Sequence, residues 1–142
     1  MAVINPYIIF NGNAEEAFNF YKSVFGGEFL MLSKMGDMPG AEQVSDAEKN
    51  RVMHVSLRIG EDILMGSDIV PSMGHKLISG NYAYISVFVE SREEADRLFN
   101  GLSEGGKIEM PMEDAFWGDY FGSFWDKYGI GWMINFPTQQ QH

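Results

Sequence analysis

The chain has 142 residues, enough for one domain that buries about two-thirds of the surface exposed by its unfolded form. Its net charge of −10 repels nucleic acid and anionic membranes, so we expect a partner of neither kind, and the absence of cysteine excludes disulfides, thiolate metal sites and a cysteine nucleophile. No segment has the length and apolarity of a membrane span and the N-terminus lacks the pattern of a signal peptide, so we expect a cytoplasmic protein.

The first elements along the chain are a strand and a helix. An apolar run at 7–10 predicts the strand. Asn13, followed three residues later by Glu16, predicts the start of a helix, because the pair can satisfy each other's free backbone amides. Apolar residues recur at helical spacing until Gly26-Gly27 ends the helix.

Three more strands complete the first half. One is expected at 29–34, and two form a hairpin over 53–68 with a glycine in its turn. Between them, 35–50 is acidic and contains proline and glycine, so we expect a long loop with one helical turn. Residues 69–81 are a connector.

The same order of elements then restarts. A strand is expected at 82–89, and Ser91 with Glu94 caps a helix that ends before Gly105-Gly106. A strand over 107–112 follows, and then an aromatic hairpin over 116–136 that contains all three tryptophans.

The two halves therefore form an internal repeat, in which Phe10 aligns with Phe88. One helix can cover only one face of its sheet, so the other face needs a partner. We predict an α+β fold in which two tandem βαβββ modules form a curved mixed sheet around a cup, with the helices outside. The modules span about 5–68 and 82–137 of a single domain, 1–142.

Several short motifs mark corresponding places in this repeat: Pro6-Tyr7, Glu16-Ala17, Phe25-Gly26-Gly27, Met53-His54, Ser67-Asp68, Gly105-Gly106, Phe116-Trp117-Gly118 and Trp132-Met133. With these motifs the chain resembles the vicinal oxygen chelate superfamily of glyoxalase I, bleomycin-resistance proteins and extradiol dioxygenases, and more narrowly its PhnB-like branch. Some members of this branch carry the name of a ubiquinone methyltransferase. This chain lacks a Gly-rich loop between strand and helix that would hold a nucleotide-like methyl donor.

The resemblance also implies where a metal would be bound. Metal-using members place His, Glu or Gln at two strand positions per module. These positions fall here at Pro6 or Tyr7, near Met65, within 83–85 and near Met133. Because none of these residues suits a hard divalent ion, we expect no metal and no other cofactor.

Candidate binding residues come from strand alternation and from the aromatic hairpin. His54, Ser56 and Arg58 share one strand face, which lines the cup or else meets solvent or a partner subunit. Tyr82, Tyr84, Ser86 and Phe88 share another, opposite an aliphatic face suited to packing under a helix. The candidate ligand-binding residues are His54, Ser56, Arg58, Met65, Tyr82, Tyr84, Ser86, Trp117, Phe121 and Met133. No catalytic residue stands out, and we expect Asp68, Asp119 and Asp126 to cap backbone amides.

The leading functional hypothesis is a metal-free protein that binds a small apolar or aromatic molecule in the cup and forms a homodimer. Whether one chain or two complete the cup stays open. One alternative is a divalent-metal-dependent lyase or dioxygenase of the same superfamily that uses an unusual ligand set around His54. A second is a protein-interaction module that recruits its partner through the acidic loop 35–50.

Overall fold

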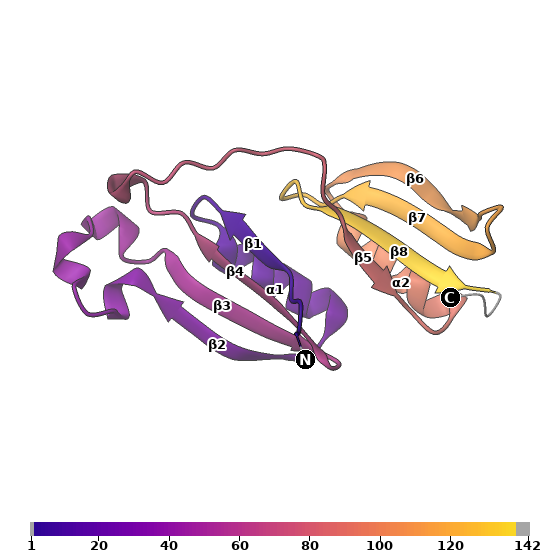
Figure 1. The fold of residues 1–142 in the computed structure, drawn as a ribbon, viewed down its shortest axis with the longest axis horizontal. Helices are drawn as coiled ribbons and strands as arrows, with labels where there is room; N and C mark the ends of the chain where they lie inside the picture. Colours follow the sequence, from indigo (N-terminus) through magenta and orange to yellow (C-terminus); the bar gives the residue numbers. More distant parts are fainter. Residues whose placement is uncertain (1, 139–142) are drawn as a thin grey trace. The chain divides into compact units, whose positions relative to one another are not determined.

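A computed structural model describes residues 2–138 and divides the chain into two compact units, with the boundary between Ser79 and Gly80 (Figure 1). We call them unit one and unit two. Each has a four-stranded mixed sheet and one α-helix, in the order strand, helix, three strands. The prediction of two tandem βαβββ modules in an α+β fold is therefore confirmed. Within residues 2–138, no helix combines the length and apolarity required to cross a membrane.

Unit one begins with its edge strand and helix. Its elements are β1 (Tyr7–Phe10), α1 (Ala14–Phe25), β2 (Glu28–Lys34), β3 (Val52–Ile59) and β4 (Asp62–Asp68). The strand order in the sheet is β1-β4-β3-β2. β1 runs parallel to β4, whereas the other pairs are antiparallel. The parallel pair is possible because α1, β2 and β3 lie between β1 and β4 in the sequence.

Unit two repeats this topology. Its elements are β5 (Ile85–Phe88), α2 (Arg92–Ser103), β6 (Lys107–Asp114), β7 (Asp119–Trp125) and β8 (Gly131–Pro137). The order in the sheet is β5-β8-β7-β6, with β5 parallel to β8. The hairpins β3–β4 and β7–β8 are thus equivalent, as the repeat in the sequence predicts.

Each helix buries one apolar stripe against its own sheet. The buried helical residues recur at the same i, i+3, i+4, i+7 spacing in both units: Ala14, Ala17, Phe18 and Tyr21 in α1, and Ala95, Leu98, Phe99 and Leu102 in α2. Beneath them lie Leu57 and Leu64 in unit one, and Phe124 and Trp132 in unit two. Each such large side chain contributes about 1.5–3 kcal/mol by leaving water.

The two helices start differently. α2 follows the prediction, since the Ser91 hydroxyl oxygen accepts a 3.0 Å bond from the Glu94 amide, while the Glu94 carboxylate accepts from Glu90. In α1 the Asn13 side chain makes no capping bond. Asp68 at the end of β4 replaces it, because its buried carboxylate accepts from the amide of Ala14 at 3.0 Å.

Asp68 joins three segments of unit one. Its Oδ1 also accepts from the Gly12 amide at 2.8 Å, and its Oδ2 accepts from the Val52 amide at 2.8 Å. Asp68 is 5 % exposed, so water has little access to these hydrogen bonds. The carboxylate thereby ties the β1–α1 connection and the start of β3 to the end of β4.

The first strand of unit two is shorter than predicted. β5 begins only at Ile85, opposite Trp132 near the start of β8, so residues 82–84 precede the strand. The alignment of Phe10 with Phe88 is also wrong. Phe10 is buried under α1, whereas Phe88 is 57 % exposed and Val89 is buried. The register of the strands explains the difference. Tyr7 pairs with Met65, and Ser86 pairs with Met133, the equivalent of Met65, so Phe10 corresponds to Val89.

The acidic segment 35–50 has more structure than the single turn we predicted. It contains three 3₁₀ turns, at Met35–Asp37, Ala41–Gln43 and Asp46–Glu48. Glu48 is buried and accepts bonds from the backbone amide and hydroxyl of Ser72 and from the Ser45 hydroxyl. The bonds from Ser72 lower the pKa of Glu48 and fix this segment to the connector.

We predict that Asp68→Ala lowers the free energy of unfolding by about 3–5 kcal/mol, because three amides lose their buried acceptor. Urea unfolding followed by circular dichroism measures the change. Asp62→Ala is the matched control, since Asp62 is exposed at the other end of the same strand. Equal stability of the two variants would contradict the role assigned to Asp68.

Candidate binding surface

The sheet face opposite the helix, which we call the open face, carries the same central row in both units. In unit one, cross-strand register places Tyr7, Met65, Ser56 and Met31 side by side. In unit two the equivalent residues are Ser86, Met133, Ser123 and Met110. Both rows therefore hold a buried serine between two methionines.

A β-bulge accompanies each row. The register of β2 shifts between Phe29 and Met31, and that of β6 shifts between Ile108 and Met110. Each shift inserts one extra residue, which is Leu30 in unit one and Glu109 in unit two. The repeat thus extends to an irregularity of the backbone, yet the inserted side chains are chemically different.

In unit one, the predicted residues of β3 lie on the open face. His54 lies next to Tyr7, with 3.4 Å between its Nδ1 and the tyrosine hydroxyl and 5.7 Å between the ring centroids. Ser56 is buried between the methionines, and Arg58 is exposed at the end of the strand, in register with Ile63. This face offers an imidazole, two hydroxyls and thioether surface.

In unit two, four residues form what we call the Glu109 cluster: Tyr84, Glu109, Ser123 and Trp125. The Tyr84 hydroxyl lies 2.9 Å from both carboxylate oxygens of Glu109, and the Ser123 hydroxyl donates to Oε1 at 2.9 Å. The Tyr84 and Trp125 rings pack with centroids 4.9 Å apart. The hydrogen bond to Glu109 raises the pKa of Tyr84, because it stabilises the protonated phenol.

Other predicted residues of unit two lie elsewhere on its open face. The Asn135 amide donates to the Ser86 hydroxyl at 2.9 Å. Trp117 packs edge-on against Phe121, with centroids 5.5 Å apart, and is 42 % exposed. Met133 lies between Ser86 and Ser123 in the central row.

One predicted residue is misplaced. Tyr82 precedes β5 and is 98 % exposed, so it does not share a strand face with Tyr84 and Ser86.

Two other prominent side chains have structural roles. Trp132 is buried and donates from Nε1 to Asp126 at 2.9 Å, and Asp126 also accepts from two backbone amides of its turn.

Sequence reasoning missed Glu109 and Ser123. Ser123 could have been predicted, because strand alternation puts it on the same face as Phe121 and Trp125. Glu109 gave no such signal, because the sequence does not show that the register of β6 shifts beside it.

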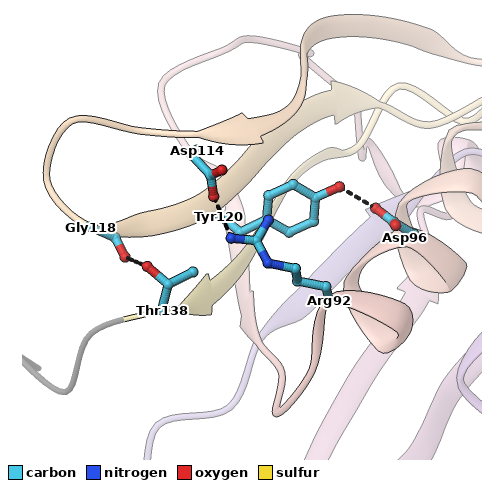
Figure 2. A network of polar contacts seen from close by, with 6 residues as sticks. All are labelled: Arg92, Asp96, Asp114, Gly118, Tyr120 and Thr138. Carbon is cyan, nitrogen blue, oxygen red and sulfur yellow. Dashed lines mark hydrogen bonds and ion pairs between the residues drawn. The ribbon is translucent and has the colours of Figure 1, made fainter.

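A second polar network supports unit two on its helical side (Figure 2). Arg92 of α2 pairs with Asp114 of β6 at 2.7 Å and stacks 4.6 Å from the ring centroid of Tyr120. The Tyr120 hydroxyl donates to Asp96 at 2.6 Å, which raises the pKa of Tyr120. The network ties α2 to the sheet and has no part in the open face.

The paired βαβββ units define the fold of the vicinal oxygen chelate superfamily. The fosfomycin resistance protein FosX of Mesorhizobium loti shares the fold, with a TM-score of 0.61 at 16 % identity over 99 % of this chain and 93 % of its own. The sequence model of the 3-demethylubiquinone-9 3-methyltransferase family matches residues 2–135, and the chain belongs to that family. The family and the fold together support the predicted superfamily and its PhnB-like branch.

Three relatives match over nearly their full length. Protein PA1353 of Pseudomonas aeruginosa is 41 % identical, with a TM-score of 0.84, over 96 % of this chain and 98 % of its own. A PhnB protein of Bacillus cereus is 27 % identical, with a TM-score of 0.77, over 95 % and 99 %. Protein YjdN of Escherichia coli K12 is 35 % identical over 96 % of this chain and 97 % of its own.

The donors at the positions implied for metal ligands do not fit a hard divalent ion. Register pairs Tyr7 with Met65 and Ser86 with Met133, so the position expected within 83–85 corresponds to Ser86 instead. Thioethers and neutral hydroxyls are poor ligands for such an ion. Between residues 2 and 138, no three His, Cys, Asp or Glu side chains gather as metal ligands would.

We predict that Tyr84 titrates above the ordinary range of tyrosine and that Glu109→Gln lowers its pKa, because a neutral amide no longer opposes the phenolate. NMR titration of ¹³C-labelled tyrosines measures both values. Tyr120, which bonds Asp96 instead, serves as an internal control and keeps its raised pKa in this variant. An unchanged Tyr84 titration would contradict the assignment.

Proposed function

We propose that this protein binds a small apolar or aromatic molecule against the open faces of its sheets, without a metal ion. The observation that carries the proposal is the central row, in which a buried serine lies between two methionines in both units. Methionine adapts its shape to different apolar ligands, and the serine hydroxyl offers a fixed polar contact.

The exposure of the open faces supports a binding role. Tyr7, Ile9 and Met31 in unit one are 46, 40 and 52 % exposed, and Phe88, Met110 and Trp117 in unit two are 57, 44 and 42 % exposed. Each unit already has a core under its helix and does not need these side chains to fold. Apolar surface of this kind is typical of binding sites and interfaces.

The family name suggests methyl transfer, but the chain does not support it. The connections from strand to helix are residues 11–13 in unit one and 89–91 in unit two. Both are short, the first contains one glycine and the second none, so neither resembles the Gly-rich loop that holds a nucleotide-like cofactor. Binding without methyl transfer fits these residues better.

We also propose that the protein is a cytoplasmic homodimer. A second copy would cover apolar side chains of the open faces, which favours association because their transfer out of water is favourable. The proposed binding surface would then include residues from both copies.

We predict that small aromatic molecules raise the melting temperature of the protein in a thermal-shift screen, since a ligand bound only by the folded state stabilises it by about 2.7 kcal/mol at 100 times its Kd. Met65→Lys and Met133→Lys should each weaken binding of a neutral hit at least about tenfold, because a charge enters the central row. Met73→Lys is the matched control, since Met73 lies in the connector and is 66 % exposed.

Two results would contradict the proposal. One is a hit whose affinity is unchanged in both central-row variants. The other is a stoichiometric divalent ion, found by elemental analysis of protein purified without chelator, whose removal abolishes ligand binding. That result would favour the metal-dependent alternative.

We predict that sedimentation equilibrium at micromolar concentration yields the mass of a dimer. Met31→Glu should shift the protein toward monomer, because the second copy would have to bury a carboxylate in place of the exposed Met31 side chain. Leu77→Glu, on the connector and 39 % exposed, provides the control. A monomeric wild-type protein would contradict the dimer.

A further inference from the structure

We propose that the Glu109 cluster recognises the positive charge of an organic cation, such as a protonated amine or a quaternary ammonium group attached to an apolar body. The inference rests on the proposed function and adds to it the charge of the ligand. It also assigns a role to the Glu109 carboxylate, which lies at the β6 bulge beside the aromatic pair Tyr84 and Trp125 on the open face of unit two.

The carboxylate is held in place by neutral donors only. Its bonds come from the hydroxyls of Tyr84 and Ser123, all at 2.9 Å. Ser123 is 1 % exposed, so its hydroxyl gives Glu109 a fixed support at the floor of the sheet. Glu109 itself lies at the surface, where a ligand can reach it.

The negative charge of Glu109 is not neutralised by the protein. The ion pairs Lys34–Glu15, Lys49–Asp46 and Arg92–Asp114 do not involve Glu109. Lys107, two residues earlier on β6, takes part in none of the three. A carboxylate held by hydroxyls keeps its full charge, and the net charge of −10 adds a long-range attraction for cations.

The aromatic pair supplies the second element of cation recognition. The rings of Tyr84 and Trp125 lie 4.9 Å apart at an angle of 44° and border the carboxylate that Tyr84 bonds. Aromatic faces attract cations, most strongly those of tryptophan. An apolar ligand without charge would gain nothing from the carboxylate. Its binding would also remove water from the carboxylate, which is unfavourable.

Gly131 creates the room for this pair. A Cβ at this position would lie 2.7 Å from Cζ3 of Trp125 and 3.0 Å from Cδ2 of Tyr84. Any larger residue would push the two rings off the strand. In unit one, Ile63 and Arg58 form the pair equivalent to Gly131 and Trp125. That unit therefore has a cation where unit two has the aromatic pair.

The test compares two probes of similar size, 2-phenylethylamine, which is a cation at neutral pH, and 2-phenylethanol, which is neutral. NMR titration of ¹⁵N-labelled full-length protein measures both affinities through the Trp125 indole and the Ser123 amide. We expect the amine to bind about tenfold more tightly than the alcohol. Added salt should weaken only the amine, because it screens only the charged probe.

Glu109→Gln should abolish the preference for the amine, while leaving alcohol binding within about twofold, because the amide oxygen still accepts from Tyr84 and Ser123. Glu113→Gln is the matched control, as Glu113 lies on the same strand in register with Phe121. This variant should retain the preference. The salt dependence of the wild-type protein tests the same point if Glu109→Gln fails to fold.

The outcomes separate this inference from the proposed function. Equal affinities for the two probes, or a preference that survives in Glu109→Gln, would overturn cation recognition and leave the proposed function standing. A salt-independent preference for the amine would overturn it as well. Failure of both probes to perturb the wild-type protein at about 10 mM would count against both proposals.

Discussion

One α-helix covers only one face of a four-stranded sheet, and the rest of this structure depends on that limit. Under the helix, each unit builds a core from a helical stripe and two inner strands, with Leu57 and Leu64 in one unit and Phe124 and Trp132 in the other. The face left over carries methionine, hydroxyl and aromatic side chains. The core and the proposed binding surface thus lie on opposite faces of the same strands, so that a substitution on one face leaves the other largely unchanged.

The acidic residues likewise include buried residues that stabilise the fold and a residue exposed on the open face. Asp68 and Asp126 are buried. Asp68 accepts from three backbone amides, and Asp126 accepts from two backbone amides and the Trp132 indole, so both carboxylates join parts of the fold. Glu109 differs because its donors are two side-chain hydroxyls and it lies at the surface. A carboxylate that accepts from buried backbone amides therefore has a structural role, whereas an exposed carboxylate held by hydroxyls remains accessible to a ligand.

The sequence was sufficient to predict the architecture, because it rests on local patterns. The spacing of Phe18 and Tyr21, the Ser91 cap and the glycines after each helix all act over a few residues. What could not be predicted depends on distant contacts or on a shift of register. Asp68 reaches Ala14 across 54 residues, and the register of β5 puts Val89 in place of Phe88. The register of β6 also shifts beside Glu109. Alternation along regular strands accounts for the position of His54 and Met133 on the open face, whereas Tyr82 lies before β5. Their ligand-binding role stays a prediction.

The bulge at Leu30 and Glu109 has an evolutionary consequence. A bulged residue has no partner across the ladder, so its replacement does not disturb the pairing of its neighbours. Within this one chain, the duplicated strands already carry a hydrocarbon at one copy of the position and an acid at the other, on nearly the same backbone. A substitution at this position therefore changes the chemistry of the open face at little cost to folding.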